Sequence, residues 1–176
     1  MTAPSSTPRP QSDSARILKK LWRSMPAEDR TAAVRAANRG GNRGAVQGLR
    51  LAVIKTMRMR PATVQSWSPQ QLADASARIA LDDDVIAELL IALHLGERVP
   101  LLTAFLDAAG VPHQEGVVED TAASEALPAE RVLAAADAVL ASFPREQCEV
   151  YFATLLALEG GGWEPLRGRV DEELTT

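Results

Sequence analysis

The sequence predicts an all-α protein, a compact multi-helix bundle of about eight or nine short helices with no sheet. Apolar residues recur at spacings of three and four positions in one segment after another, and no segment alternates apolar with polar side chains. Aromatic residues are only 4% of the chain, so the core must consist of Leu, Val, Ile and Ala, which suit packed helices. Prolines and glycines interrupt the chain at short intervals, so each expected helix is short.

The first part of the chain should hold a tail and three helices. Residues 1–12 are rich in proline, serine and threonine and are expected to form a disordered tail. A first helix is expected from about Asp13 to Arg23, with an apolar stripe opposite a basic face. Pro26 opens a second, alanine-rich helix, which ends at the glycine-rich stretch 38–44. A third helix is expected over 45–59.

The middle of the chain should hold a short helical turn after Pro61 and then two helices. Residues 68–71 have the spacing of a capping box, which starts the first of these helices. Three aspartates, 82–84, open the second, whose apolar side chains cover nearly its whole circumference. This helix is therefore predicted to be the central buried one, with Leu89 and Leu90 in the core.

Four more helices are expected in the second half. The first covers about 100–110, two amphipathic ones cover 128–141 and 144–159, and a short one covers 163–170. Residues 113–126 are expected to form an acidic loop. The core is predicted to come from the central buried helix together with these four.

The net charge of −4 conceals a division along the chain. Residues 1–60 hold 13 Lys and Arg against 3 Asp and Glu, whereas residues 61–176 hold 6 against 20, so the net charges are +10 and −14. Such asymmetry indicates either an external partner or two halves that dock on each other. The expected organisation is a disordered tail over 1–12, a basic helical N-terminal segment over 13–60, an acidic helical core over 61–170 and an acidic tail over 171–176.

Several compartments and site classes are disfavoured by simple counts. The longest apolar run, 85–95, is much shorter than the ~20 residues that a membrane span needs. The first ten residues lack the apolar segment of a signal peptide. Cys148 is the chain's single cysteine and cannot form an internal disulfide, so a cytoplasmic location is predicted.

Neither a metal site nor a catalytic residue is predicted. His94 and His113 are separated by a helix of about ten residues, or ~15 Å along its axis, too far for one metal ion. His94 is expected to bond free carbonyls at its helix end. The group His113, Glu115, Glu119 and Asp120 has no recognised metal spacing. No cofactor is expected.

The nucleophile and DNA-reading alternatives are disfavoured as well. Cys148 lies beside Glu146 and Glu149, which would raise its pKa, so it is interpreted as a structural cysteine. A helix-turn-helix over 70–93 would present the aspartates 82–84 to phosphates at the start of its second helix, and they would repel them.

The expected function is a non-catalytic helical protein-interaction module, an adaptor or accessory protein, with a basic N-terminal contact surface. An acidic protein surface is the expected partner. Arg39 and Arg43 flank a Gly/Asn loop whose backbone amides could join them in receiving an anionic group. The alternative is a sequence-nonspecific nucleic-acid-associated protein that uses the same surface, and a third hypothesis is a helical enzyme with an unrecognised site. The predicted contact residues are Arg16, Lys19, Lys20, Arg23, Arg35, Arg39, Arg43 and Arg50.

Overall fold

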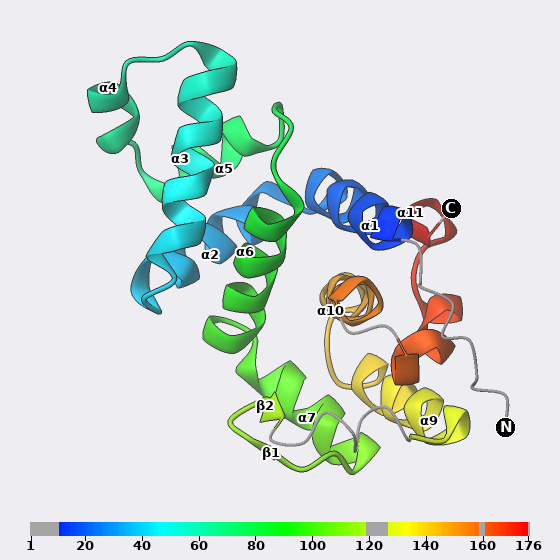
Figure 1. The fold of residues 1–176 in the computed structure, drawn as a ribbon. Helices are drawn as coiled ribbons and strands as arrows, with labels where there is room; N and C mark the ends of the chain where they lie inside the picture. The colour runs from blue at the N-terminus through cyan, green and yellow to red at the C-terminus, as the bar shows by residue number, and fades with distance from the viewer. Residues whose placement is uncertain (1–10, 119–126, 159–160, 176) are drawn as a thin grey trace, which may run out of the picture.

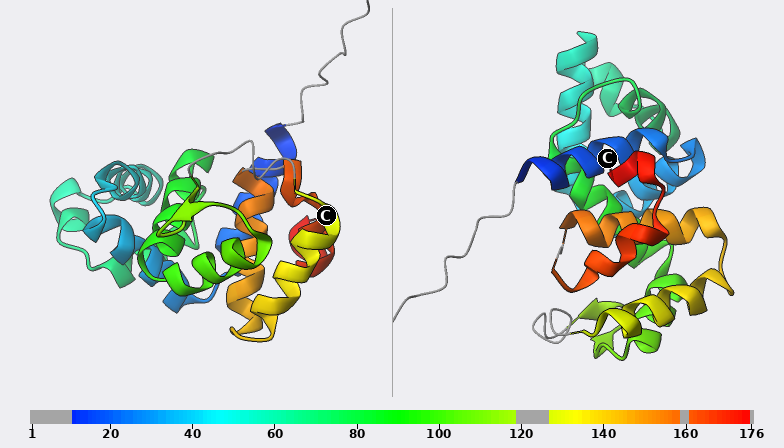
Figure 2. Two further views of the ribbon diagram at one scale, coloured as in Figure 1. Left: turned by 90° about the horizontal axis from the view of Figure 1, so that it is seen from below. Right: turned by 90° about the vertical axis from the view of Figure 1, so that its right-hand side faces the viewer.

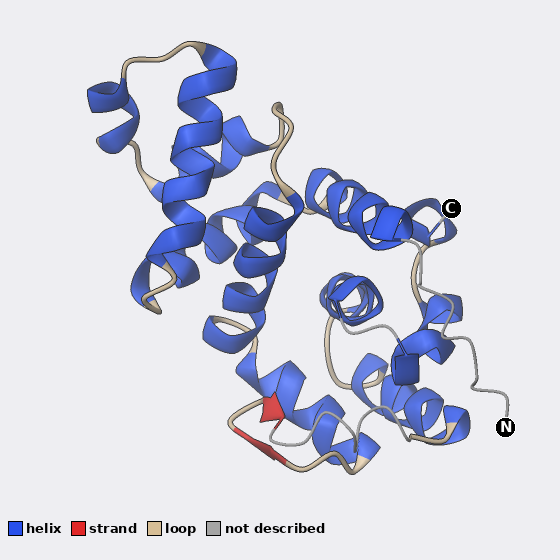
Figure 3. Cartoon of the chain, in the orientation of Figure 1, coloured by secondary structure: helices blue, strands red, loops and turns tan. Residues whose placement is uncertain are grey.

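A computed structural model of the chain describes residues 11–118, 127–158 and 161–175. Helices make up 76% of it, so the predicted all-α fold is confirmed. The described residues contain one small departure from a purely helical chain, a hairpin of two short strands, which Figure 3 colours red. In chain order the elements are α1 (Gln11–Ser24), α2 (Ala27–Arg39), α3 (Arg43–Met57), α4 (Pro61–Gln65), α5 (Pro69–Ser76), α6 (Asp83–Gly96), α7 (Val99–Ala109), β1 (His113–Gln114), β2 (Val117–Val118), α9 (Ala129–Leu140), α10 (Arg145–Leu158), the 3-10 helix η1 (Gly161–Arg169) and α11 (Glu172–Thr175).

Helix α6 lies at the centre of the arrangement and contacts α1, α2, α3, α7 and α10. Figure 1 shows α3 on one side of α6, with α1 and α10 on the other side. Helices α3, α4 and α5 form a lobe at the upper left of Figure 1, whereas α7 and α9 lie together at the bottom. The two further views in Figure 2 show the same separation between the α3 lobe and the α9–α10 region.

Buried apolar side chains form a cluster that draws on both charge segments of the chain. Leu21 and Trp22 of α1 and Leu49 of α3 belong to it together with the apolar residues of α6, α7 and α10. The indole Nε1 of Trp22 donates a hydrogen bond to Ser76 Oγ 3.1 Å away, which joins α1 to the end of α5. The boundary at residue 60 therefore separates two regions of charge, while the core extends across it.

Helix α6 follows its sequence prediction on most of its circumference. Leu89, Leu90 and Leu93 are fully buried, which confirms the prediction for the first two. Burial of each such side chain contributes about 1.5–3 kcal/mol relative to exposure. The prediction of burial nearly all round is wrong on one side, where Ile91 and Leu95 are each 40% exposed. The packed helices leave this side of α6 uncovered among the described residues.

Local signals set the ends of several elements. The capping box is present at the start of α5, where Ser68 Oγ accepts from the Gln71 amide and the Gln71 side chain accepts from the Ser68 amide. The hairpin replaces the first part of the expected acidic loop because Glu115 and Gly116 both adopt positive φ, of 51° and 90°. This is the backbone of a type I′ turn, which tight two-residue hairpins favour.

Three segments that were predicted as tails or loops lie partly outside the residues that the structure describes. Residues 1–10 of the expected disordered tail are not among the described residues, and Gln11 already belongs to α1. Residues 119–126 of the expected acidic loop likewise lie outside them. The expected acidic tail over 171–176 contains the short helix α11.

The longest of the described helices, α3, has 15 residues. None of them alone is long and apolar enough to cross a bilayer, although α6 and α7, which are bent by 86° at their junction, meet the length and composition requirement as a pair.

Candidate functional site

The predicted contact residues do not gather on one surface. Those on α1 and those on α3 lie on opposite sides of α6 (Figure 1). On α1, Arg16 forms an ion pair with Asp13, and Lys19 Nζ lies 3.0 Å from a carboxylate oxygen of Asp83 on α6. Lys20 is half-buried and Arg23 is exposed.

The two arginines predicted to flank the Gly/Asn loop, Arg39 and Arg43, do not line the hollow beside it. Arg39 forms an ion pair with Glu97, which follows the last turn of α6. A hollow of about 390 Å³ lies beside the loop, and the described residues that line it include no cation. Ile91 and Leu95 form part of that lining. The loop thus has an apolar neighbourhood, and Arg39 is directed to a carboxylate of the chain itself.

Exposed cations do gather on one side of α3. Arg43, Lys55 and Arg58 are exposed. Arg43 and Lys55 lie on the side of α3 that is turned away from the buried Leu49, and Arg58 caps the C-terminal end of the helix. These three cations and the exposed Arg60, which follows α3, form the basic face. Within the described ranges, none of the four forms an ion pair.

The origin of the basic face lies in the sequence. Residues 30–73 contain eight Lys and Arg and no Asp or Glu, so no carboxylate within this stretch neutralises the cations of α3. From Arg43 to Arg58 the face extends about 22 Å at 1.5 Å per residue. Two other predicted contact residues are not part of the basic face. Arg35 is exposed on α2. Arg50 is half-buried on α3, and its Nε has no hydrogen-bond partner among the described residues.

The charge division is partly internal. Lys19 and Arg39 of the basic segment meet Asp83 and Glu97 of the acidic segment, so these two cations dock on the chain's own acidic half. A further pair crosses the same boundary with its signs reversed. Asp29 of α2 pairs with Arg98, whose side chain is almost completely buried at the junction of α6 and α7. The cations of the basic face are not used in these pairs and stay open to solvent, as do Arg23 and Arg35.

A second feature is an apolar cleft of about 280 Å³ between α6, α10 and the hairpin. Its opening is lined by Ile91, Leu95 and Val117, which are 40%, 40% and 56% exposed. These are three of the five large apolar side chains that are exposed in the described part of the chain. The cleft is therefore the place where exposed apolar surface is concentrated.

His94 forms part of the cleft wall and is only 4% exposed. Its Nε2 lies 3.2 Å from Thr154 Oγ1, and that hydroxyl donates its proton to the Val150 carbonyl at 2.7 Å. Because the threonine proton is committed, Nε2 must carry the ring proton and donate to Oγ1. The unprotonated Nδ1 has no hydrogen-bond partner among the described residues.

The environment keeps the His94 ring neutral. Burial, together with the smaller effect of the nearby positive charge of Arg98, lowers its pKa from 6.5 to about 3. The ring also packs edge-on against Tyr151, with ring centroids 5.0 Å apart. The prediction that His94 bonds free carbonyls at its helix end is wrong, because α10 brings a hydroxyl to it from 60 residues away.

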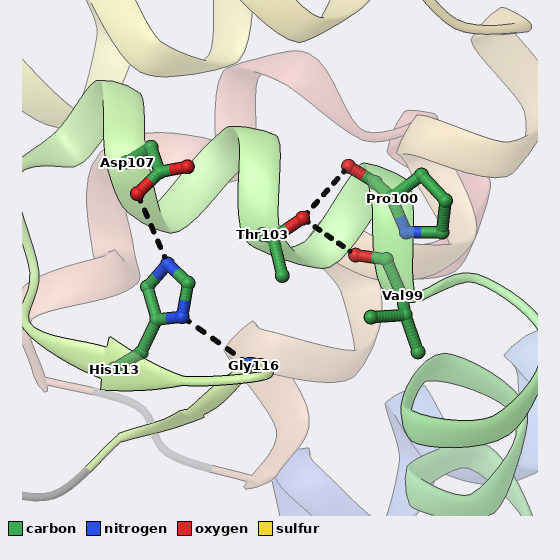
Figure 4. A network of polar contacts seen from close by, with 6 residues as sticks. All are labelled: Val99, Pro100, Thr103, Asp107, His113 and Gly116. Atoms are coloured by element: carbon green, nitrogen blue, oxygen red, sulfur yellow. Dashed lines mark hydrogen bonds and ion pairs between the residues drawn. The ribbon is translucent and has the colours of Figure 1, made fainter.

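His113 uses both ring nitrogens within the fold, as Figure 4 shows. Its Nε2 lies 3.2 Å from a carboxylate oxygen of Asp107 on α7, and its Nδ1 accepts from the Gly116 amide at 3.2 Å. The histidine therefore joins the hairpin turn to α7. Both ring nitrogens of His113 have partners, whereas Nδ1 of His94 has none among the described residues.

Cys148 is buried, and its Sγ lies 3.7 Å from the Val139 carbonyl oxygen. Burial raises the pKa of the thiol, Arg98 opposes this effect and Glu149 adds to it. Among the residues that the structure describes, no group of three or more His, Cys, Asp or Glu side chains is arranged to hold a metal ion.

Sequence reasoning missed the cleft and part of the basic face. Lys55, Arg58 and Arg60 were recognisable from the absence of carboxylates over 30–73. The cleft left no comparable signal, because its walls come from α6, the hairpin and α10, which are far apart along the chain.

Comparison of the chain with protein-family models, with curated proteins and with solved structures finds no match.

Proposed function

We propose that this protein is a non-catalytic helical interaction module that binds an acidic protein partner through the basic face of α3. The observation that carries the proposal is that Arg43, Lys55, Arg58 and Arg60 are exposed together, without an ion pair among the described residues, in a stretch that lacks carboxylates. Such a concentration of one sign of charge steers an oppositely charged partner toward the surface.

Leu51 supports a protein partner over a nucleic acid. It is 55% exposed and lies on the same side of α3 as Arg43 and Lys55, eight residues after the first and four before the second. A leucine inside a cationic surface gains from an apolar pocket with an acidic rim, as protein interfaces provide. A phosphate backbone offers it no such contact, although the cations alone would suit phosphates equally well.

The test is a binding titration with two synthetic probes of equal charge. One probe is a 15-residue helical peptide with glutamates flanking a leucine stripe, and the other has the leucines replaced by glutamine. Fluorescence anisotropy should show tighter binding of the leucine-bearing peptide. The variant Leu51→Ala should reduce that preference to near unity, while binding of the glutamine peptide stays unchanged.

Charge reversal locates the surface. The triple variant Arg43→Glu, Lys55→Glu, Arg58→Glu should lose binding of both peptides while keeping its helical circular dichroism. The matched control reverses three exposed arginines elsewhere, Arg78, Arg131 and Arg145, and so has the same net charge. Equal loss in the control would contradict a localised site. Stronger binding of a 20-base-pair DNA duplex than of either peptide, with a steep fall as salt rises, would favour the nucleic-acid alternative.

A further inference from the structure

We infer that the acidic partner of the basic face is a second copy of this chain, which receives Leu51 in a hollow between α1, α10 and α11. The inference rests on the proposed function, because it names the partner of the same surface. It is carried by the complementary charge and shape of two surfaces that lie apart on one chain.

The receiving surface is a hollow of about 330 Å³ that combines an apolar floor with a rim of carboxylates. Its lining includes three buried apolar side chains and three acidic ones, Leu21, Met25, Val150, Glu146, Glu149 and Asp171, which form the acidic hollow. An apolar pocket with an acidic rim is what a leucine surrounded by cations complements.

Carboxylates set the sign of the exposed rim. Glu146 and Asp171 are both exposed. Two cations lie near them, but each is held by another group of the chain. Arg145 bonds to Glu149, and the buried Arg30 donates to backbone carbonyls at the C-terminal end of α1. The surface that a partner meets around the floor of the hollow is therefore acidic.

The inserting surface is centred on Leu51, which is 55% exposed. It lies between Arg43 and Lys55 on the outward side of α3, so cations surround it as carboxylates surround the acidic hollow. Docking would cover the leucine and the floor of the hollow, which removes apolar surface from water. The opposite charges around them would guide the approach and fix its register.

The two surfaces lie on opposite sides of the central helix. Figure 1 shows α3 on one side of α6, with α1, α10 and α11 on the other. A single chain therefore does not bring Leu51 to its own acidic hollow, whereas two copies can. Because the two surfaces differ, the contact is head-to-tail, and each bound copy still offers one unused surface to another.

Sedimentation velocity at protein concentrations from about 5 µM to about 500 µM tests the apolar part of the contact. The weight-average sedimentation coefficient of the unaltered protein should rise with concentration. Leu51→Ala should weaken this self-association about tenfold, because the leucine no longer fills the hollow. The matched control Val117→Ala truncates a side chain of equal exposure (56%) on the hairpin and should associate like the unaltered protein.

Charge reversal tests the two surfaces separately. One variant reverses the basic face (Arg43→Glu, Lys55→Glu, Arg58→Glu), and the other reverses the acidic hollow (Glu146→Lys, Asp171→Lys). Each alone should stay monomeric with unchanged helical circular dichroism. Mixed together they should associate, because each reversed surface then meets a surface of opposite charge. The control Glu115→Lys, Glu130→Lys has the same net charge as the second variant and should self-associate normally.

The outcomes separate this inference from the proposed function. A protein that stays monomeric up to the highest concentration, yet binds the leucine-bearing peptide, would overturn the inference and leave the proposed function standing. Failure to bind the peptide as well would contradict both. Self-association that persists unchanged in Leu51→Ala or after reversal of the acidic hollow would also overturn the inference.

Discussion

Gly48 of α3 packs directly against Val85 of α6. A Cβ atom placed on Gly48 would lie 2.8 Å from Val85 Cγ2, closer than carbon atoms normally approach. The absence of a side chain at this position therefore allows α3, and the basic face that it bears, to lie tightly on the central helix. A similar close approach occurs between α6 and α2, where a Cβ atom placed on Gly96 would lie 3.0 Å from Ala36 Cβ.

Gly48→Ala should destabilise the protein despite the better helix propensity of alanine. The change gains about 1 kcal/mol of propensity inside a helix, but it forces apart two packed helices at a stiff, β-branched valine, which costs about 1–3 kcal/mol. Chemical denaturation should show a net loss. In a Val85→Ala background the same change should become stabilising, and a stabilising effect without Val85→Ala would show that the helices are not closely packed there.

The buried Asp29–Arg98 pair should matter far more than an exposed pair across the same boundary. Asp29→Ala leaves the buried guanidinium of Arg98 without its countercharge and should lower the unfolding free energy by about 3 kcal/mol or more. Glu97→Ala, which removes the partner of the largely exposed Arg39, should cost about 0–1 kcal/mol. Urea melts compare the two.

A second substitution checks the cause. Adding Arg98→Met to Asp29→Ala removes the uncompensated charge and should recover much of the lost stability. If the double variant is as unstable as Asp29→Ala alone, the loss arises from packing around Asp29 and not from the buried charge.

His94 should make stability depend on pH below neutrality. Its pKa is about 3 in the folded protein and about 6.5 when unfolded, so the unfolded state binds the proton more readily in the interval between them. The contribution of the neutral His94 ring to the unfolding free energy is fully present above about pH 6.5. It decreases as pH falls toward 3, by up to ~1.4 kcal/mol per pH unit.

Urea melts at several pH values, on the unaltered protein and on His94→Gln, isolate this effect from the carboxylates. The difference in unfolding free energy between the two proteins should shrink steadily as pH drops from 6.5 to 4. A difference that stays constant across this range would mean that His94 is protonated with similar ease in both states.

Arg58 has a backbone conformation that suits glycine. It lies in the left-handed region with φ of 52°, and its amide bonds the Ile54 carbonyl at the end of α3. Arg58→Gly and Arg58→Ala remove the same charge, but only glycine adopts this conformation without steric cost. Thermal melts should therefore show Arg58→Gly more stable than Arg58→Ala by about 1 kcal/mol. Equal stability of the two variants would contradict the left-handed assignment.

The sequence alone determined the helical class and much of the local structure. The capping box at Ser68 and the burial of Leu89 and Leu90 follow from residue order, because helix caps and apolar periodicity involve neighbours within a few positions. The concentration of cations over 30–73 is also a property of the sequence. The hairpin at Glu115 and Gly116 was missed because strands of two residues are too short to show alternation.

Only the tertiary structure decided how the individual charges and the histidine are used. Arg39 meets Glu97 from 58 residues away and His94 meets Thr154 from 60 residues away. Periodicity assigns a side chain to a face of its own helix, but it does not identify which distant helix packs on that face. The side of α6 that no described helix covers and the cleft between α6, α10 and the hairpin arise from that packing, which the order of residues along the chain does not specify.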